Sequence, residues 1–125
     1  MNKLLLTLLA SLLVTGAAWA EWVQLVEIEN GYAYIDPATI RKDGNLRGVW
    51  EITDFKQRDK DGELSRRARV EYDCQQERFK FLSISSHSGP MASGTTLRSV
   101  IGNGQWDDIP PGSAGETVLK IDCAK

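Results

Sequence analysis

The stretch that decides the fold reads Leu64-Ser-Arg-Arg-Ala-Arg-Val-Glu-Tyr-Asp-Cys74. In it Ala68, Val70, Tyr72 and Cys74 alternate with charged residues, which is the period of a strand with one buried face. This spacing predicts a central strand that places Cys74 on one side of a sheet. By themselves, the residues indicate a small exported α+β domain and no catalytic chemistry.

The sequence contains two cysteines, Cys74 and Cys123, which are 49 residues apart. An even cysteine count in an exported chain is typical of a disulfide. Two cysteines allow one intramolecular pairing, which would fix the final helix onto the sheet and contribute about 4 kcal/mol of stability. The alternatives are an intermolecular disulfide or a metal site, although two cysteines without a CxxC spacing or a paired histidine make a poor zinc site.

Residues 1–20 are typical of a secretory signal peptide. Lys3 supplies the positive start, residues 4–14 form the apolar run, and Ala18-Trp19-Ala20 is a small-residue cleavage site. The apolar run is shorter than the roughly 20 residues that span a bilayer. We therefore expect residues 21–125 to form one exported domain with no stable membrane anchor, in the periplasm, at the cell surface or outside the cell.

The charge balance argues against nucleic acid as a partner. The whole chain has 15 Lys and Arg against 17 Asp and Glu, and removal of the predicted signal peptide takes one Lys with it. Proteins that bind nucleic acid normally carry a clearly basic domain. We therefore expect no nucleic-acid partner.

Turn signals separate the predicted strands. Strands are expected at residues 22–29, 32–36, 46–55, 64–74, 78–86 and 96–101. Asn30-Gly31 is a strong hairpin signal, because both central positions of the tight turn need positive φ. Residues 86–96 are expected to form a long loop. Ser113 and Glu116 form a predicted capping box, which would start a helix over residues 113–124.

This order predicts an α+β fold: an antiparallel sheet of five or six strands, with a C-terminal helix packed on one face and linked to it by the disulfide. The helix would be about 18 Å long and about 10 Å wide, whereas five strands span about 24 Å. One such helix is too small to cover a face of the sheet. Either the sheet curls on itself or part of it contacts a partner.

No residue pattern indicates catalysis, so we expect a protein that is not an enzyme and that uses no cofactor and no metal. His87 is the single histidine and lies in the predicted Ser-rich loop. No serine has the G-x-S-x-G spacing of a catalytic nucleophile, so a serine triad is not indicated. Asp59, Asp61 and Glu63 surround Gly62 but lack the full spacing of a calcium-binding loop. We interpret them as a solvated turn.

The remaining candidate site is a cluster of basic residues on two neighbouring strands: Arg66, Arg67, Arg69, Arg78 and Lys80. Across a tight turn expected around Gln75 and Gln76, Arg67 and Arg69 should share a face with Arg78 and Lys80. Such a patch can bind a polyanion such as heparin, or a protein partner. The competing interpretation, which we favour, is that Glu71, Asp73 and Glu77 neutralise the cluster.

Several landmarks follow one another in a distinctive order: Tyr34-Ile35-Asp36, Val49-Trp50-Glu51, Glu71-Tyr72-Asp73-Cys74, Trp106 before Ile109-Pro110-Pro111-Gly112-Ser113, and Cys123. Together they resemble the bacterial surface-adhesin protein E family, over nearly all of residues 21–125. The resemblance implies an antiparallel sheet flanked by a C-terminal helix, a disulfide between the two, and a tendency to form homodimers. It also implies non-enzymatic binding to host matrix proteins such as vitronectin and laminin.

Two functions follow from these expectations. The first is an adhesin-like protein that contacts host matrix proteins, and the second is a periplasmic protein that binds a bacterial partner or oligomerises in the envelope. The resemblance assigns no ligand-binding residue. Cell fractionation separates the two functions, because protease-shielded protein found only in the periplasm excludes the first.

Overall fold

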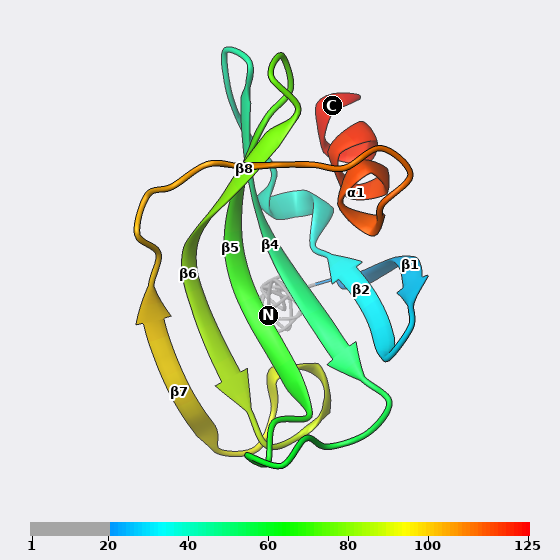
Figure 1. The fold of residues 1–125 in the computed structure, drawn as a ribbon, viewed down its shortest axis with the longest axis vertical. Helices are drawn as coiled ribbons and strands as arrows, with labels where there is room; N and C mark the ends of the chain where they lie inside the picture. Colours follow the sequence, from blue (N-terminus) through cyan, green and yellow to red (C-terminus); the bar gives the residue numbers. More distant parts are fainter. Residues whose placement is uncertain (1–20) are drawn as a thin grey trace, which may run out of the picture.

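The computed structural model describes residues 21–125, so the predicted signal peptide lies outside the described residues. Neighbouring strands pair antiparallel along one path: β1 (Val23–Ile28), β2 (Gly31–Ile35), β4 (Leu46–Phe55), β5 (Ser65–Asp73), β6 (Arg78–His87) and β7 (Thr96–Ile101). Two short strands pair off this path, β3 (Arg41–Asp43) with β4 and β8 (Asp107–Asp108) with β6. Figure 1 shows the resulting single twisted sheet.

The predicted antiparallel α+β fold is confirmed, with two differences in detail. The short strands β3 and β8 were not predicted, because two or three residues are too few to show an alternation. Cys74 directly follows β5 instead of ending it. The turn there is closed by Asp73, whose Oδ1 accepts hydrogen bonds of 3.0 Å from the N–H groups of Gln75 and Gln76.

The single helix, α1 (Ala114–Cys123), begins at the predicted cap. Ser113 Oγ accepts a hydrogen bond of 3.3 Å from the Glu116 N–H. The reciprocal half of the predicted capping box does not form, because the Ser113 N–H donates to Pro110 O and the Glu116 carboxylate pairs with Lys120 at 3.2 Å. One side chain therefore caps the helix start, and the other forms a salt bridge one turn further along α1.

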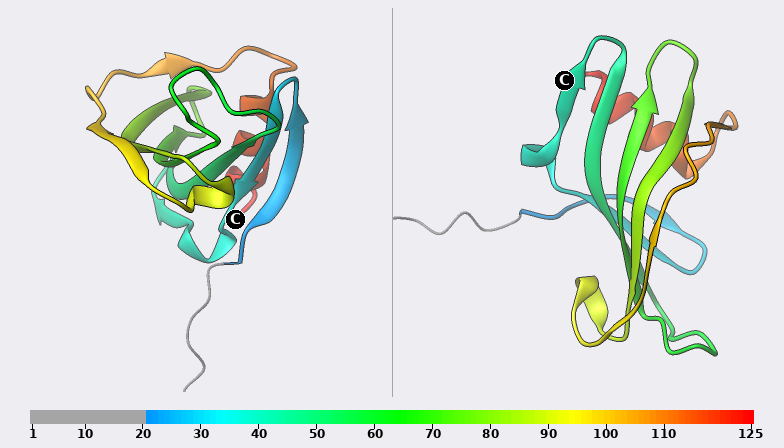
Figure 2. Two further views of the ribbon diagram at one scale, coloured as in Figure 1. Left: turned by 90° about the horizontal axis from the view of Figure 1, so that it is seen from below. Right: turned by 90° about the vertical axis from the view of Figure 1, so that its left-hand side faces the viewer.

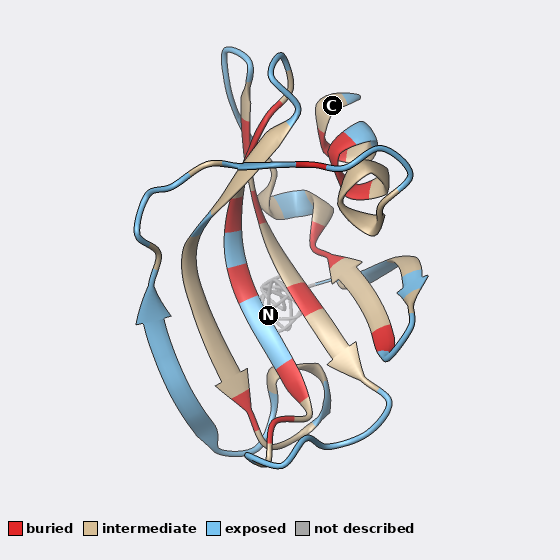
Figure 3. Ribbon diagram, in the orientation of Figure 1, coloured by how far each residue is buried: buried red, intermediate tan, exposed pale blue. Residues whose placement is uncertain are grey.

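Helix α1 packs against one face of the sheet, as predicted. Val118 and Leu119 are buried there against Val49, Val70 and Tyr72. The Cys74–Cys123 disulfide, with an S–S distance of 2.02 Å, joins the end of α1 to the turn after β5, which confirms the predicted pairing. Figure 3 shows buried residues along β4 and β5 and in α1, and the hydrophobic core cluster forms where α1 meets these strands.

The opposite face carries two short 3₁₀ turns, η3 (Pro37–Thr39) and η4 (Pro90–Ala92). Figure 2 shows α1 on one side of the sheet and these turns on the other. The predicted loop at residues 86–96 is more ordered than expected, because β6 extends to His87 and the loop folds back onto the sheet. We call the face that carries η3 and η4 the open face, because no helix covers it in residues 21–125.

The η4 loop is fixed to the end of the open face by hydrogen bonds. Ser65 is fully buried, and its Oγ donates to Gly89 O at 2.6 Å and accepts from the Ala92 N–H at 2.8 Å. The Met91 N–H donates to Asp54 Oδ1 at 2.9 Å. The rest of the open face, between η3 and β7, is left partly accessible.

Candidate functional site

The predicted basic cluster divides between the two faces of the sheet. Ala68, Val70 and Tyr72 lie in the core under α1, so the alternate residues of β5, including Arg67 and Arg69, lie on the open face. The register pairs Glu71 with Lys80 and Asp73 with Arg78, which places both of these basic residues on the open face too. Arg66 falls on the α1 face, so four of the five residues share a face.

Three of the five basic residues are neutralised by salt bridges. Arg78 lies 3.0 Å from Asp73, and Lys80 lies 3.3 Å from Glu71. Arg66 binds both carboxylate oxygens of Glu63, at 2.7 and 3.2 Å. The predicted pairing with Glu71 and Asp73 is thus present. Glu77 forms no salt bridge within residues 21–125, and Glu63 was not predicted as a partner.

Two of these carboxylates are stabilised in their charged form. The Gln76 N–H, together with Arg78, lowers the pKa of Asp73. Burial alone would raise the pKa of Glu63, but hydrogen bonds from Arg66 and Ser86 and the charge of Arg66 lower it. Both carboxylates therefore stay ionised beside their basic partners at neutral pH.

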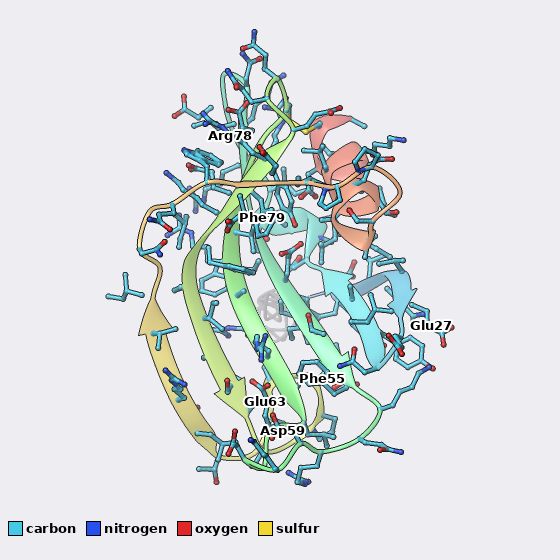
Figure 4. All side chains as sticks on the ribbon, viewed as in Figure 1. Glu27, Phe55, Asp59, Glu63, Arg78 and Phe79 are labelled. Carbon is cyan, nitrogen blue, oxygen red and sulfur yellow. A yellow bond between two sulfur atoms is a disulfide. The ribbon has the colours of Figure 1, made fainter. Side chains whose placement is uncertain are left out.

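Trp106 also covers the paired part of the cluster. The centre of its ring lies 4.6 Å from Arg78 Cζ and 4.5 Å from Lys80 Nζ, which is the geometry of a cation–π contact. Figure 4 labels Arg78 at this end of the sheet. Arg78 and Lys80 are therefore held on two sides, by a carboxylate and by an aromatic ring.

Arg67 and Arg69 differ from the other three basic residues, because both are exposed and neither forms a salt bridge within residues 21–125. Arg67 Cζ lies 4.6 Å from the centre of the Trp50 ring, and Arg69 is paired with Trp50 across β4 and β5. Two positive charges and one partly exposed aromatic ring thus lie together on the open face.

The η3 turn fixes the backbone of Trp50. The Trp50 N–H donates to Thr39 Oγ1 at 3.1 Å, and the Asp36 N–H donates to Trp50 O at 3.2 Å. Asp36 in turn caps η3, because its Oδ1 accepts from the Ala38 N–H at 3.2 Å. The Asp36-Pro37 stop that ends β2 therefore also positions the aromatic residue of the site.

Trp50 lies between two hollows on the open face. One, of about 720 Å³, is lined by Trp50, Arg69, Ile40, Leu82, Glu71 and Gly48 among others. The other, of about 400 Å³, extends from Trp50 and Arg67 to Ser85, Ser99 and Ile101. We call Trp50, Arg67 and Arg69 with these two hollows the Trp50 surface. It is the candidate binding site.

Gly48 helps to keep the larger hollow open. A Cβ atom built on Gly48 has no atom within 4 Å, and its backbone φ is not in the left-handed region. Sequence reasoning missed both Gly48 and Trp50 as site residues. One signal was available in the sequence. Trp50 directly follows Val49 on a predicted strand, so if Val49 faces the core, Trp50 lies on the opposite face.

His87 is built into the sheet and does not lie in a loop. It is 8% exposed, its Nε2 lies 2.7 Å from Ser85 Oγ, and its Nδ1 lies 3.4 Å from Thr96 Oγ1. Burial lowers the pKa of His87, and the charge of Arg67 lowers it further, while Glu63 opposes the shift. The ring therefore joins β6 to β7 mainly in its neutral form at pH 7.

The acidic residues around Gly62 close a turn. Asp59 Oδ1 accepts hydrogen bonds of 2.9 Å from the N–H groups of both Asp61 and Glu63. Figure 4 labels Asp59 and Glu63 at this turn, where Glu63 is buried against Arg66 instead of being solvated as predicted. In the part of the chain that the structure describes, no group of three or more His, Cys, Asp or Glu side chains is placed to hold a metal ion.

Comparison with known proteins supplies the family. The model of the family Surface-adhesin protein E matches residues 22–124. The chain belongs to this family. No curated protein sequence matches it significantly. Membership supports a surface-adhesin role, binding to protein partners, and an exported or cell-surface location.

Solved structures agree with the fold. Crystal form II of Haemophilus influenzae protein E is similar with a TM-score of 0.64 at 15% identity, over 86% of this chain and 91% of that chain. Protein E from non-typeable Haemophilus influenzae is similar with a TM-score of 0.60 at 16% identity, over 88% of this chain and 79% of that chain. At these identities the likeness establishes the fold. Within residues 21–125, α1 is too short and too polar to cross a membrane.

Proposed function

We propose that this protein is an exported, non-enzymatic adhesin that binds a protein partner through the Trp50 surface. The observation that carries the proposal is the contrast within the basic cluster. Arg66, Arg78 and Lys80 are paired with carboxylates, whereas Arg67 and Arg69 flank an aromatic ring and form no salt bridge within residues 21–125. The free charges are therefore available to a partner.

The composition of the surface suits protein recognition. Tryptophan and arginine are the residues most enriched among those that dominate binding energy at protein interfaces. The hollows on either side of Trp50 give a partner side chain a place to insert, and the two guanidinium groups favour carboxylate or sulfate groups on the partner. We therefore infer an acidic partner segment.

We further propose that the partners include host matrix proteins such as vitronectin and laminin. The support for this step is membership of the surface-adhesin family together with the free positive charge of the Trp50 surface. Electrostatic attraction of this kind mainly speeds association and weakens as salt is added. Binding is accordingly expected to fall between low and physiological ionic strength.

The test compares two charge-reversal variants that alter net charge equally. Arg67→Glu/Arg69→Glu changes the Trp50 surface, and Lys60→Glu/Lys125→Glu changes two exposed residues elsewhere. Binding to immobilised vitronectin, laminin and heparin is measured for both variants. The first variant is expected to lose at least about tenfold in affinity, or about 1.4 kcal/mol, and the second much less. Equal losses, or unchanged heparin elution for the first variant, contradict the proposal.

The second candidate function, a periplasmic protein that binds an envelope partner or a second copy of itself, is supported by strand β7. Every residue of β7 is exposed, Ile101 is 89% exposed, and within residues 21–125 β7 pairs with β6 alone. An exposed apolar edge strand is a template for pairing with another strand.

Leu97→Lys tests this second function, because Leu97 is an exposed apolar residue of β7 that lines neither hollow of the Trp50 surface. A charged residue on an edge strand disfavours strand pairing, so the variant is expected to lower the mass measured by sedimentation, or to reduce recovery of envelope partners. A monomeric wild-type chain that recovers no envelope partner contradicts the second function. Cell fractionation then decides whether the protein reaches the surface.

A further inference from the structure

A cavity of about 250 Å³ lies on the α1 face, away from the Trp50 surface. The first half of α1 borders it with Ala114, Gly115 and Val118, and the sheet contributes Phe79, Phe81 and Ala68 among others. Figure 4 labels Phe79 just below the segment that leads into α1. Most of the cavity wall is thus apolar or aromatic.

Glu51 contributes a carboxyl group to this apolar wall. One of its oxygens accepts a hydrogen bond of 2.5 Å from the Tyr72 hydroxyl. Asp122 of α1 is fully buried close to this pair, and neither of its oxygens has a hydrogen-bond partner within residues 21–125. Two carboxyl groups therefore lie beneath α1.

Within residues 21–125 neither of these carboxyl groups forms a salt bridge. Arg66 also lines the cavity, but it binds both oxygens of Glu63. Arg47 is buried, and its guanidinium donates to the carbonyl oxygens of Gly44, Leu46 and Lys125, at 2.8, 2.9 and 3.4 Å, while its Nε has no hydrogen-bond partner within residues 21–125. Burial raises the pKa of Glu51 to about 8, and the negative charge of Asp122 adds to the shift. A positive charge placed in the cavity would stabilise the ionised form of Glu51, which burial disfavours.

The aromatic wall favours the same kind of ligand. The Phe79 and Phe81 rings pack edge to face with their centres 5.4 Å apart, and Phe81 is partly exposed. A cation close to an aromatic ring is stabilised by the ring quadrupole, and more strongly so when it is desolvated. Rings and a carboxylate together make a binding site for an ammonium group that carries an apolar body.

We propose that the cavity between α1 and the sheet binds a small organic amine, with Glu51 as the counter-ion and Phe79 and Phe81 as its apolar and aromatic wall. The volume suits one aromatic ring with a short alkylamine chain. A ligand with a carboxylate would place a negative charge beside Glu51 and Asp122, neither of which forms a salt bridge within residues 21–125. A neutral ligand would gain nothing from ionisation of Glu51, so its affinity would not rise with pH.

The first experiment uses the full domain and three probes of similar size: phenethylamine, 2-phenylethanol and 3-phenylpropionate. Methyl and aromatic NMR spectra locate binding, and calorimetry at pH 6 and pH 8.5 measures affinity. Phenethylamine is expected to shift signals of Ala68, Ala114 and Val118 and to bind at least about tenfold more tightly than the other probes. Its affinity is expected to rise about tenfold from pH 6 to pH 8.5, as Glu51 ionises.

The second experiment uses variants. Glu51→Gln keeps the shape of the side chain and is expected to weaken phenethylamine binding about tenfold and to remove its pH dependence. The control Glu77→Gln, at an exposed position outside the cavity, is expected to bind like the wild type. Ala114→Leu fills the cavity without touching the carboxyl group and is expected to abolish binding. It also serves as the test if Glu51→Gln does not fold.

Three outcomes overturn the proposal. The first is equal affinity for phenethylamine and 2-phenylethanol, and the second is signal changes confined to the open face. The third is unchanged affinity in both Glu51→Gln and Ala114→Leu. Loss of matrix-protein binding through Arg67 and Arg69 has no bearing on this site, so the two proposals fail independently.

Discussion

The Tyr72 hydroxyl donates a hydrogen bond of 2.5 Å to Glu51 Oε1 beneath α1, close to the buried carboxyl group of Asp122. Burial raises the pKa of Glu51 to about 8 and that of Asp122 to about 7. These groups hold their protons more tightly in the folded chain than in the unfolded chain. The free energy of unfolding is therefore expected to fall as the pH rises from about 4, where these groups ionise in the unfolded chain, to about 7 and 8, and to level off above that.

Urea denaturation at pH 5, 7 and 9 measures this trend. Asp122→Asn removes one of the charges, so it is expected to flatten the decline and to be more stable than the wild type at pH 9, by on the order of 1 kcal/mol. The exposed Glu29→Gln serves as the control and is expected to leave the slope unchanged. A wild-type chain that is as stable at pH 9 as at pH 5 contradicts this account of the buried carboxyl groups.

Reduction of the Cys74–Cys123 disulfide is expected to destabilise the fold strongly. The bond closes a loop between residues 49 apart, so its loss lowers the free energy of unfolding by about 4 kcal/mol in the chain-entropy model. Urea unfolding with and without a reducing agent measures the effect. The double variant Cys74→Ser/Cys123→Ser is expected to match the reduced wild type and to show no response to reductant. A reductant effect in that variant would mean that the change does not come from the disulfide.

Ser65→Ala is expected to loosen the η4 loop from the sheet. The variant removes one hydrogen bond to Gly89 O and one from the Ala92 N–H at a fully buried position, so the expected cost is about 1–3 kcal/mol. Hydrogen exchange should accelerate at Ala92 while the amide hydrogens of β5 stay protected. Ser99→Ala, on the exposed strand β7, is the matched control and is expected to be near neutral. Unchanged exchange at Ala92 would show that Ser65 does not fix the loop.

Gly48→Val is expected to fill the larger hollow of the Trp50 surface without straining the fold. The new side chain enters open space on a strand, so the free energy of unfolding should stay the same or rise by up to about 1 kcal/mol. Binding to vitronectin or laminin should weaken, and Gly48→Ala should weaken it less. Surface plasmon resonance measures both. Undiminished binding by Gly48→Val would mean that the partner does not enter this hollow.

Much of the fold follows from local sequence patterns. The alternation around Val70 and Tyr72 predicts which side of β5 faces the core, and Ser113 predicts the start of α1. Two cysteines in an exported chain predict the disulfide. These features rest on period, capping and counting, which require no knowledge of distant parts of the chain.

The features that sequence reasoning missed depend on which distant groups meet. Ser65 has a polar side chain and yet is fully buried, because the returning η4 loop supplies its hydrogen-bond partners. Arg66 forms its salt bridge with Glu63 because the preceding turn, closed by Asp59, places Glu63 beside it. Trp50 stays partly exposed while Val49 and Ile52 are buried on opposite faces, and the η4 loop packs on the open face near Asp54 and Ser65. Period alone cannot reveal which part of a face a loop will cover.

The disulfide also sets a limit on how far this protein can be stretched. If tension is applied between residues 21 and 125, the covalent link from Cys74 to Cys123 carries the force past β6, β7 and α1. The 49 residues between the two cysteines cannot be extended while the disulfide is intact, so the chain's maximum extension is shorter by about 160 Å. Under a pulling force such as fluid shear, the strands before Cys74 would unravel first, and the edge strand β7 would remain inside a closed covalent loop.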